Sequence, residues 1–212
     1  MKGIRTPVRK IAGATDIFER VARQIEPILA HVLILLPPSE KKATTAGPAI
    51  SVYTGVLYNA LSWATLTKSA QARGSKSLII ISAKYGVLKP LDVIEPYKQK
   101  INAGEMREEV TNELSQIPTE LIIDCRSSTY KTVWTPPHEK SVEIKVFTKV
   151  DGTKKVITHM SKKTRGEVTR LLLLSKKLPT NPRGLQAIVA QHYECELLPA
   201  SENYPWVLEV IC

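Results

Sequence analysis

The chain has 212 residues, 43% of them hydrophobic and 24% charged, a balance that excludes an intrinsically disordered protein and fits one sizeable domain or at most two small ones. Its formal net charge of +10 is unevenly spread. Residues 131–177 hold 12 Lys or Arg against 4 Asp or Glu, whereas residues 178–212 hold 1 against 4. Such a basic segment either binds a polyanion, nucleic acid above all, or is a solvated face that aids solubility.

Cysteine usage and hydropathy narrow the class of protein further. Cys125, Cys195 and Cys212 form no CxxC pair and no metal-ligand spacing, which favours a reducing cytoplasm over a disulfide framework. Cys125 precedes Arg126 and is either a thiol of lowered pKa or a small packed residue. The longest mostly apolar stretch, residues 28–38, is shorter than the roughly 20 residues that a membrane helix needs. We therefore expect a cytoplasmic protein without a membrane segment, metal site or cofactor.

The beginning of the chain predicts an arm followed by a helix. Residues 1–14 are basic and show no period, while residues 16–29 place apolar side chains at helical spacing after Asp16 as a cap. The apolar run Val32–Leu36 is short and uninterrupted, as in a strand that is buried on both faces.

The middle of the chain alternates predicted helices with further buried strands. Two more apolar runs, residues 78–81 and 121–123, predict strands of the same kind. The other segments, in chain order, are a flexible linker at 43–51 and helices at 54–64, 66–73 and 106–117.

After Lys140 the pattern changes to a hairpin followed by a basic helix. Apolar residues alternate over 142–146, Asp151-Gly152 marks a turn, and a second strand is predicted to include Val156 and Thr158. The remaining predictions are a helix that opens at Ser161, a helix at 183–192, and strands at 193–197 and 206–211. The whole pattern predicts the α/β class: a single domain with a mixed β-sheet flanked by helices.

Polar side chains follow each of the three buried strands. Open α/β sheets bind ligands at the carboxyl ends of their strands, so these three segments are predicted to meet in one site. Acidic and basic residues recur there: Glu40 with Lys42, Asp92 with Lys84 and Lys89, and Asp124 with Arg126. Such pairs suit proton transfer or the recognition of a base or phosphate, and they are equally common as structural ion pairs. Glu40, Lys42 and Asp124 are the candidate catalytic residues.

Hydroxyl groups and a basic helix start add candidate binding residues. The hydroxyls that either bind phosphate oxygens or close turns are Ser39, Ser82, Tyr85, Tyr97, Ser127, Ser128 and Tyr130. Lys162, Lys163 and Arg165 follow the predicted start of a helix, where unpaired N–H groups favour anions. This stretch is therefore either an anion-binding site or an incidental run of basic residues on the surface.

Standard catalytic signatures are absent from the sequence. It contains no GxxxxGK[ST], GxGxxG, HExxH or GxSxG, and its histidines lack the i,i+4 spacing of metal ligands. Two hypotheses remain open. Residues 140–177 bind nucleic acid without sequence preference, or the strand ends form an enzyme site for a nucleoside, nucleotide or damaged base.

Five blocks of the sequence, in this order, resemble the YaaA family of bacterial peroxide stress proteins. They are LILLPPSEKK, VYTGVLYNAL, SAKYGVLKPLDVIEPYK, IIDCRSSTY and ITHMSKKTRG, and they cover most of residues 33–170. The resemblance implies a cytosolic protein of the response to hydrogen peroxide that limits unincorporated iron, and with it oxidative damage to DNA. It also implies an α/β fold with a positively charged cleft that binds double-stranded DNA.

The resemblance also implies which residues line that cleft, block by block. Carried over by position, they are Ser39, Glu40 and Lys42, then Tyr53, Thr54 and Gly55, then Tyr85, Gly86, Asp92 and Tyr97, then Asp124, Ser127 and Tyr130, and last Lys162 and Lys163.

Four departures from the family pattern stand out. Lys41 replaces a usual Gly, and Lys98, a further binding candidate, replaces a usual Arg, which keeps the charge but loses the bidentate fork. Residues 1–31 are an N-terminal extension before a YaaA-like domain at 32–212. That domain is shortened between residues 43 and 52, where the family carries a helical segment that we expect to contain its helix-hairpin-helix contact to DNA. Its loss weakens the expectation of duplex binding.

Overall fold

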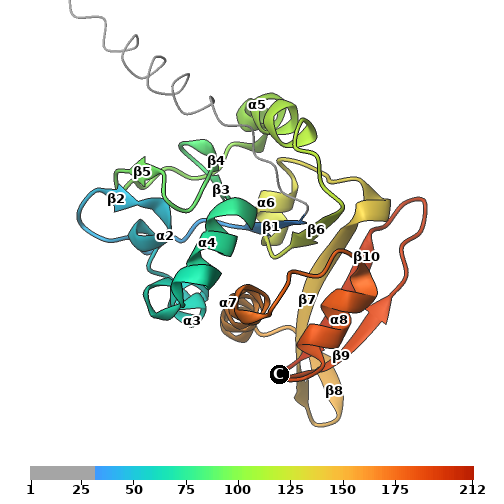
Figure 1. Cartoon of the computed structure of the whole chain (residues 1–212). Coiled ribbons are helices and arrows are strands. Elements are labelled where there is room, and N and C mark those ends of the chain that lie inside the picture. Colours follow the sequence, from blue (N-terminus) through green and yellow to red (C-terminus); the bar gives the residue numbers. More distant parts are fainter. Residues whose placement is uncertain (1–31) are drawn as a thin grey trace, which may run out of the picture.

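The structure, a computed structural model, describes residues 32–212 (Figure 1). The predicted arm and helix within residues 1–31 lie outside this range. In chain order the elements are β1 (Val32–Leu36), β2 (Gly47–Pro48), α2 (Ala49–Val52), α3 (Val56–Leu61), η1 (Trp63–Thr65), α4 (Lys68–Ser77), β3 (Leu78–Ser82), β4 (Gly86–Leu88), β5 (Val93–Ile94), α5 (Ala103–Ser115), β6 (Leu121–Asp124), α6 (Ser128–Lys131), η2 (His138–Lys140), β7 (Ser141–Val150), β8 (Thr153–Lys155), α7 (Thr158–Leu174), α8 (Pro182–Val189), β9 (Glu194–Leu198) and β10 (Trp206–Ile211).

An eight-stranded mixed sheet forms the middle of the molecule, which confirms the predicted fold class. Its order is β4-β3-β1-β6-β7-β10-β9, with β8 paired to β7. Strands β3, β1, β6, β7 and β10 run parallel, whereas β4, β8 and β9 are antiparallel to their neighbours. A separate two-stranded sheet joins β2 to β5.

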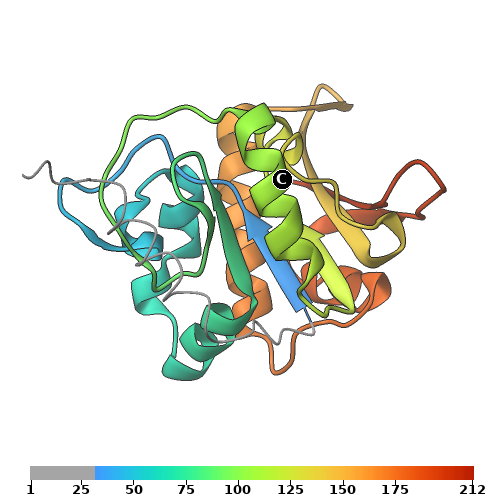
Figure 2. The ribbon, with the colours of Figure 1, turned by 90° about the horizontal axis from the view of Figure 1, so that it is seen from above.

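The apolar runs of the central strands lack alternation because helices cover both faces of the sheet (Figure 2). On one face Leu33 and Leu35 pack in a cluster with Met106 of α5. On the other face Ile34 and Leu36 belong to the larger cluster that α3, α4 and α7 complete. Every residue of β1 is at most 3% exposed.

Helices α3 and α7 approach each other closely at Gly166. A Cβ atom at this position would lie 2.2 Å from the Leu57 carbonyl oxygen, so only glycine permits this separation. One turn further along α7, Arg170 donates hydrogen bonds of 3.0 Å to the carbonyl oxygens of Leu61 and Ser62. These hydrogen bonds hold the end of α3 beside the second half of α7.

Several predicted boundaries are wrong, each for a local physical reason. The predicted helix at 54–64 ends at Ser62, which adopts a left-handed conformation with φ 48°. Helix α7 begins at Thr158, so Thr158 is not in a strand and Ser161 does not open the helix. The Ser161 hydroxyl instead donates to the Ile157 carbonyl oxygen at 3.0 Å, as a serine inside a helix does. The predicted linker at 43–51 holds β2 and most of α2.

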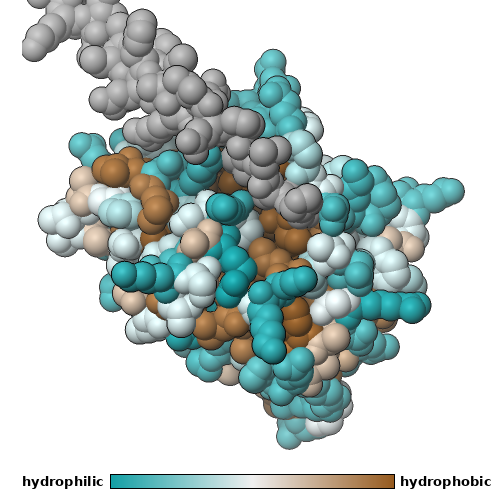
Figure 3. All heavy atoms as spheres, in the orientation of Figure 1, coloured by the Kyte–Doolittle hydropathy of each residue, from teal (hydrophilic) through white to brown (hydrophobic). Residues whose placement is uncertain are grey.

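Residues 43–52 border an apolar surface. Leu91 and Val93 are 55% and 61% exposed beside β2, and a hydrophobic patch covers β5 in Figure 3. The backbone N–H groups of Ala49 and Ile50 donate to the carbonyl oxygens of Asp92 and Pro90, which ties this segment to the loop after β4.

Candidate functional site

The structure brings the three predicted strand ends to one edge of the sheet. Strands β3, β1 and β6 are neighbours and run parallel, so the segments that follow Leu36, Ser82 and Asp124 leave the sheet at its carboxyl edge. Five side chains from the first two of these segments and from the loops beside them form what we call the strand-end cluster: Lys42, Tyr53, Ser82, Tyr85 and Tyr97.

A chain of hydroxyl groups organises the strand-end cluster. The Tyr97 hydroxyl lies 2.9 Å from the Tyr53 hydroxyl and 2.8 Å from the Ser82 hydroxyl. Ser82 in turn accepts hydrogen bonds from the backbone N–H groups of Lys84 and Tyr85. Tyr53 is 1% exposed, and its burial raises the pKa of its phenol well above the ordinary value, so this group stays protonated. The Tyr53 hydroxyl can therefore donate a hydrogen bond but does not supply a negative charge.

Two lysines place their ammonium groups over tyrosine rings of the cluster. Lys42 Nζ lies 4.2 Å from the centroid of the Tyr97 ring, and Lys84 Nζ lies 4.8 Å from that of Tyr85. The Tyr85 and Tyr97 rings meet edge to face, with their centroids 5.6 Å apart. Partial burial lowers the pKa of Lys42, although the charge of Glu40 acts in the opposite direction. Half-buried aromatic rings with cations at their faces can bind planar, anionic groups.

Glu40 and Tyr130 lie near the cluster. Lys42 Nζ donates a long hydrogen bond of 3.5 Å to the Glu40 carbonyl oxygen, whereas no side-chain hydrogen bond joins Tyr130 to the cluster within residues 32–212. Glu40 is exposed, and its charge acts on both Lys42 and Tyr130. The pKa of Tyr130 is raised to about 12, mainly by burial and to a smaller extent by the neighbouring Tyr97 and Glu40. Ser39 and Gly55 are in close contact, because a Cβ atom on Gly55 would lie 2.1 Å from the Ser39 hydroxyl.

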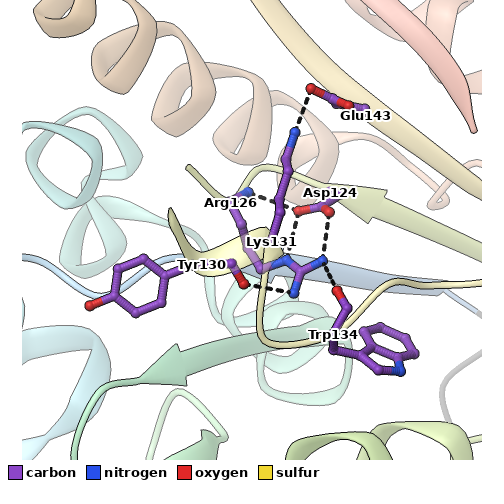
Figure 4. A network of polar contacts seen from close by, with 6 residues as sticks. All are labelled: Asp124, Arg126, Tyr130, Lys131, Trp134 and Glu143. Atoms are coloured by element: carbon purple, nitrogen blue, oxygen red, sulfur yellow. Dashed lines mark hydrogen bonds and ion pairs between the residues drawn. The ribbon is translucent and has the colours of Figure 1, made fainter. Parts of the chain in front are cut away.

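Asp124 and Arg126 form a buried ion pair rather than an open acid–base pair (Figure 4). The guanidinium donates to Asp124 Oδ1 at 2.9 Å and to Oδ2 at 2.8 Å, and the Arg126 backbone N–H donates to Oδ1 as well. Burial by itself would raise the pKa of Asp124, but the hydrogen bonds and charge of Arg126 lower it below its ordinary value. The remaining guanidinium contacts go to the carbonyl oxygens of Tyr130 and Trp134. In this geometry Asp124 orients Arg126, and Arg126 fixes the loop after β6 through its hydrogen bonds to the carbonyl oxygens of Tyr130 and Trp134.

Other predicted residues have local roles or no contact with the cluster. Gly86 has φ 67°, which its turn between β3 and β4 requires, and an added Cβ would face Glu109. Asp92 accepts a hydrogen bond of 2.8 Å from the Lys89 N–H and closes a turn. The Thr54 hydroxyl is buried without a hydrogen-bond partner. Lys98, Ser127 and Ser128 have no hydrogen bond to the strand-end cluster among the contacts of residues 32–212.

The basic segment, residues 131–177, is partly neutralised in space. Lys163 pairs with Glu167, Lys149 with Glu194, and Lys154 with Glu209. Because α7 begins at Thr158, Lys162 and Lys163 lie in its second turn, after the first unpaired N–H groups. Lys162 is exposed and makes no ion pair within the described part of the chain.

Cys125 is a packed residue and not a reactive thiol. It is fully buried, and burial raises its pKa to about 12. Within residues 32–212 no three His, Cys, Asp or Glu side chains gather closely enough to hold a metal ion. Nor does any helix of this range combine the length and apolarity needed to cross a bilayer.

The sequence did not single out Tyr58 and Trp134, although both support the loops at this edge. The Tyr58 hydroxyl donates to the Pro37 carbonyl oxygen at 2.8 Å, and the Trp134 carbonyl accepts from Arg126. Tyr58 lies within the predicted helix at 54–64, and no sequence signal separates it from the other residues of that helix.

The fold and the site together define an α/β protein with a lysine- and tyrosine-rich cluster at the carboxyl edge of a mixed sheet. A family model described as "Peroxide stress protein YaaA" matches residues 35–197, so the chain belongs to the YaaA peroxide stress family. This result confirms the resemblance that the five blocks indicated.

Relatives support the same assignment. A UPF0246 protein of Streptomyces coelicolor is 31% identical over 182 residues, which are 79% of this chain and 70% of that protein. A UPF0246 protein of Corynebacterium glutamicum is 34% identical over 153 residues, 66% of this chain and 60% of its own length. A third, from Shewanella pealeana, is 30% identical over 150 residues, 61% of this chain and 57% of its own. The chain thus spans about 60% of the length of the latter two relatives.

Proposed function

We propose that this protein acts in the response to hydrogen peroxide by binding nucleic acid at the strand-end cluster. The observation that carries the proposal is the placement of the Lys42 and Lys84 ammonium groups over the rings of Tyr97 and Tyr85. Proteins that bind nucleic acid without sequence preference combine cations for the phosphates with aromatic rings for the bases. Family membership supports the link to peroxide stress.

The finer proposal is that the protein lowers free iron in the cytoplasm and thereby limits oxidative DNA damage. Two observations support it. The matching family is described as peroxide stress proteins, and the three free cysteines fit a reducing compartment. The test is expression of this chain in a bacterial strain that lacks its own family member. Lower free iron by electron paramagnetic resonance and better survival of peroxide are expected, and unchanged values of both would refute this part.

Binding is tested by titrating labelled duplex and single-stranded DNA at several salt concentrations. Since each neutralised phosphate contributes about −0.9 to the slope of log affinity against log salt on a duplex, Lys42→Gln should reduce the slope by about 1. Tyr85→Ala should weaken binding at every salt concentration, by about 1 kcal/mol or more if a base stacks on the ring. Lys155→Gln is the matched control, because Lys155 is exposed on β8 and makes no ion pair within residues 32–212. No complex at low salt, or equal losses in the control, would contradict the proposal.

A second candidate function is an enzyme acting on a nucleoside, nucleotide or damaged base at the same edge. Its support is the exposed carboxylate of Glu40, whose charge acts on the partly buried Lys42. Asp124 is a weaker acid–base candidate because Arg126 occupies both of its oxygens. Turnover of a nucleoside panel that is abolished in Glu40→Gln would support this alternative, whereas equal turnover would remove Glu40 from the mechanism.

A further inference from the structure

A large cavity on the surface of the described chain lies away from the strand-end cluster. It has a volume of about 960 Å³ and is bounded by the second half of α5, the start of β6 and residues 132–140. These segments belong to the α5 side of the sheet, where Leu114, Ile117 and Ile122 pack in one cluster. A volume of this size is at the upper end of the range of small-molecule sites, which are commonly apolar with a few placed polar groups.

The lining of this cavity, which we call the α5 cavity, combines an apolar floor with positive charge. Leu114, Ile117, Ile122, Val133 and Trp134 form the apolar floor, and each of them is at most 9% exposed. Threonine and serine side chains from α5 and from residues 132–135 add hydroxyl groups.

The charged groups of the lining are all positive. Arg107 and Lys140 are the two charged residues among those that line the α5 cavity, and no carboxylate is among them. An uncompensated positive charge beside an apolar surface favours a ligand that is both anionic and partly apolar.

The wall of the α5 cavity is held in place by the buried ion pair. The Trp134 carbonyl accepts a hydrogen bond of 2.9 Å from Arg126, whose side chain is fully buried and fixed by Asp124 (Figure 4). Trp134 is 6% exposed and Val133 is fully buried, so both are packed without a ligand. Arg107 donates to the Thr132 carbonyl oxygen at 3.1 Å, which ties α5 to the same loop. A preformed wall lowers the entropic cost of binding.

We propose that the α5 cavity binds a small anionic molecule with a flat apolar body. Its carboxylate, sulfonate or phosphate lies against Arg107 and Lys140, and its body lies on the floor beside Trp134. This site is separate from the strand-end cluster and does not depend on nucleic-acid binding. Charge-assisted hydrogen bonds are stronger than neutral ones, so the cations distinguish anionic ligands from neutral ones of the same shape.

The test uses the full chain and two probes of similar shape, the anionic 8-anilinonaphthalene-1-sulfonate and the uncharged N-phenyl-1-naphthylamine. The anionic probe is expected to bind at one saturable site, with energy transfer from tryptophan. The double variant Arg107→Gln/Lys140→Gln should weaken its affinity about tenfold or more and leave the neutral probe unchanged. Trp134→Phe should reduce energy transfer while affinity is kept, which locates the probe.

The matched control is Lys76→Gln plus Lys155→Gln, which removes the same charge from residues that do not line the α5 cavity. Circular dichroism and thermal unfolding of every variant exclude loss of the fold as the cause. The proposal is overturned if the anionic probe does not saturate one site, or if both double variants bind it equally. It is likewise overturned if the loss of charge weakens both probes to the same extent.

Discussion

Arg126→Met tests whether the buried Asp124–Arg126 pair is a structural support. The substitution replaces arginine with an unbranched apolar side chain. It removes both contacts to the carboxylate and the hydrogen bonds to the carbonyl oxygens of Tyr130 and Trp134. Asp124, whose side chain is 7% exposed, would then be a buried charge without its cation. The variant should therefore be much less stable than the parent.

The size of the loss follows from the burial of the pair. Removing one partner of a buried ion pair costs about 3–5 kcal/mol. For a domain of this size each 1 kcal/mol lowers the melting temperature by about 2–4 °C, so a fall of roughly 6–20 °C is expected. Since total stabilities are about 5–15 kcal/mol, the variant should keep a free energy of unfolding between about 0 and 12 kcal/mol.

Urea unfolding followed by circular dichroism at two pH values is the assay. The folded pKa of Asp124 is lowered in the parent, so the pair stabilises the fold above the unfolded pKa of about 3.9 and loses this effect as pH falls through the folded pKa. In Arg126→Met burial instead favours the protonated acid, and the deficit should be largest at pH 7 and shrink towards pH 4.

A surface pair provides the control for this prediction. Lys154→Met breaks a pair with Glu209 in which the lysine side chain is 40% exposed, and it should cost no more than about 1 kcal/mol. A loss below 1 kcal/mol in Arg126→Met, or a deficit that grows as pH falls, would refute the reasoning.

Three further outcomes are expected. Gly166→Ala should destabilise the fold by about 1–3 kcal/mol in urea unfolding, because its methyl group would meet the Leu57 carbonyl oxygen; an unchanged midpoint would contradict the close approach of α3 and α7. The thiol of Cys125 should react with Ellman's reagent at pH 8 only after unfolding, since it is buried and its pKa is raised to about 12, whereas fast reaction of the folded protein would show that it is accessible. Tyr97→Phe should cost about 1 kcal/mol in thermal unfolding by removing the hydroxyl between Tyr53 and Ser82, and no cost would mean that water replaces it.

Local sequence patterns predicted most elements but missed boundaries that depend on partners. Leu78 to Ile81 has no polar residue, so its burial on both faces was readable without coordinates. Helix α7 has no side-chain cap at Ile157, and Ser161, a capping residue type close before the apolar face, lies a turn inside the helix. The hairpin turn at Asp151-Gly152 was predicted because both residues favour positive φ, which they adopt at 51° and 76°.

The sequence by itself determined the buried central strands, the class of fold and the family, because uninterrupted apolar runs and short blocks of residues are local properties of the chain. Only the tertiary structure decided which charges remain available. The glutamates of β9 and β10 neutralise Lys149 and Lys154, and Arg126 engages Asp124, while Lys42 approaches Tyr97 from more than 50 residues away. Electrostatic attraction acts through space, so a count of charges along the chain cannot show which of them are paired.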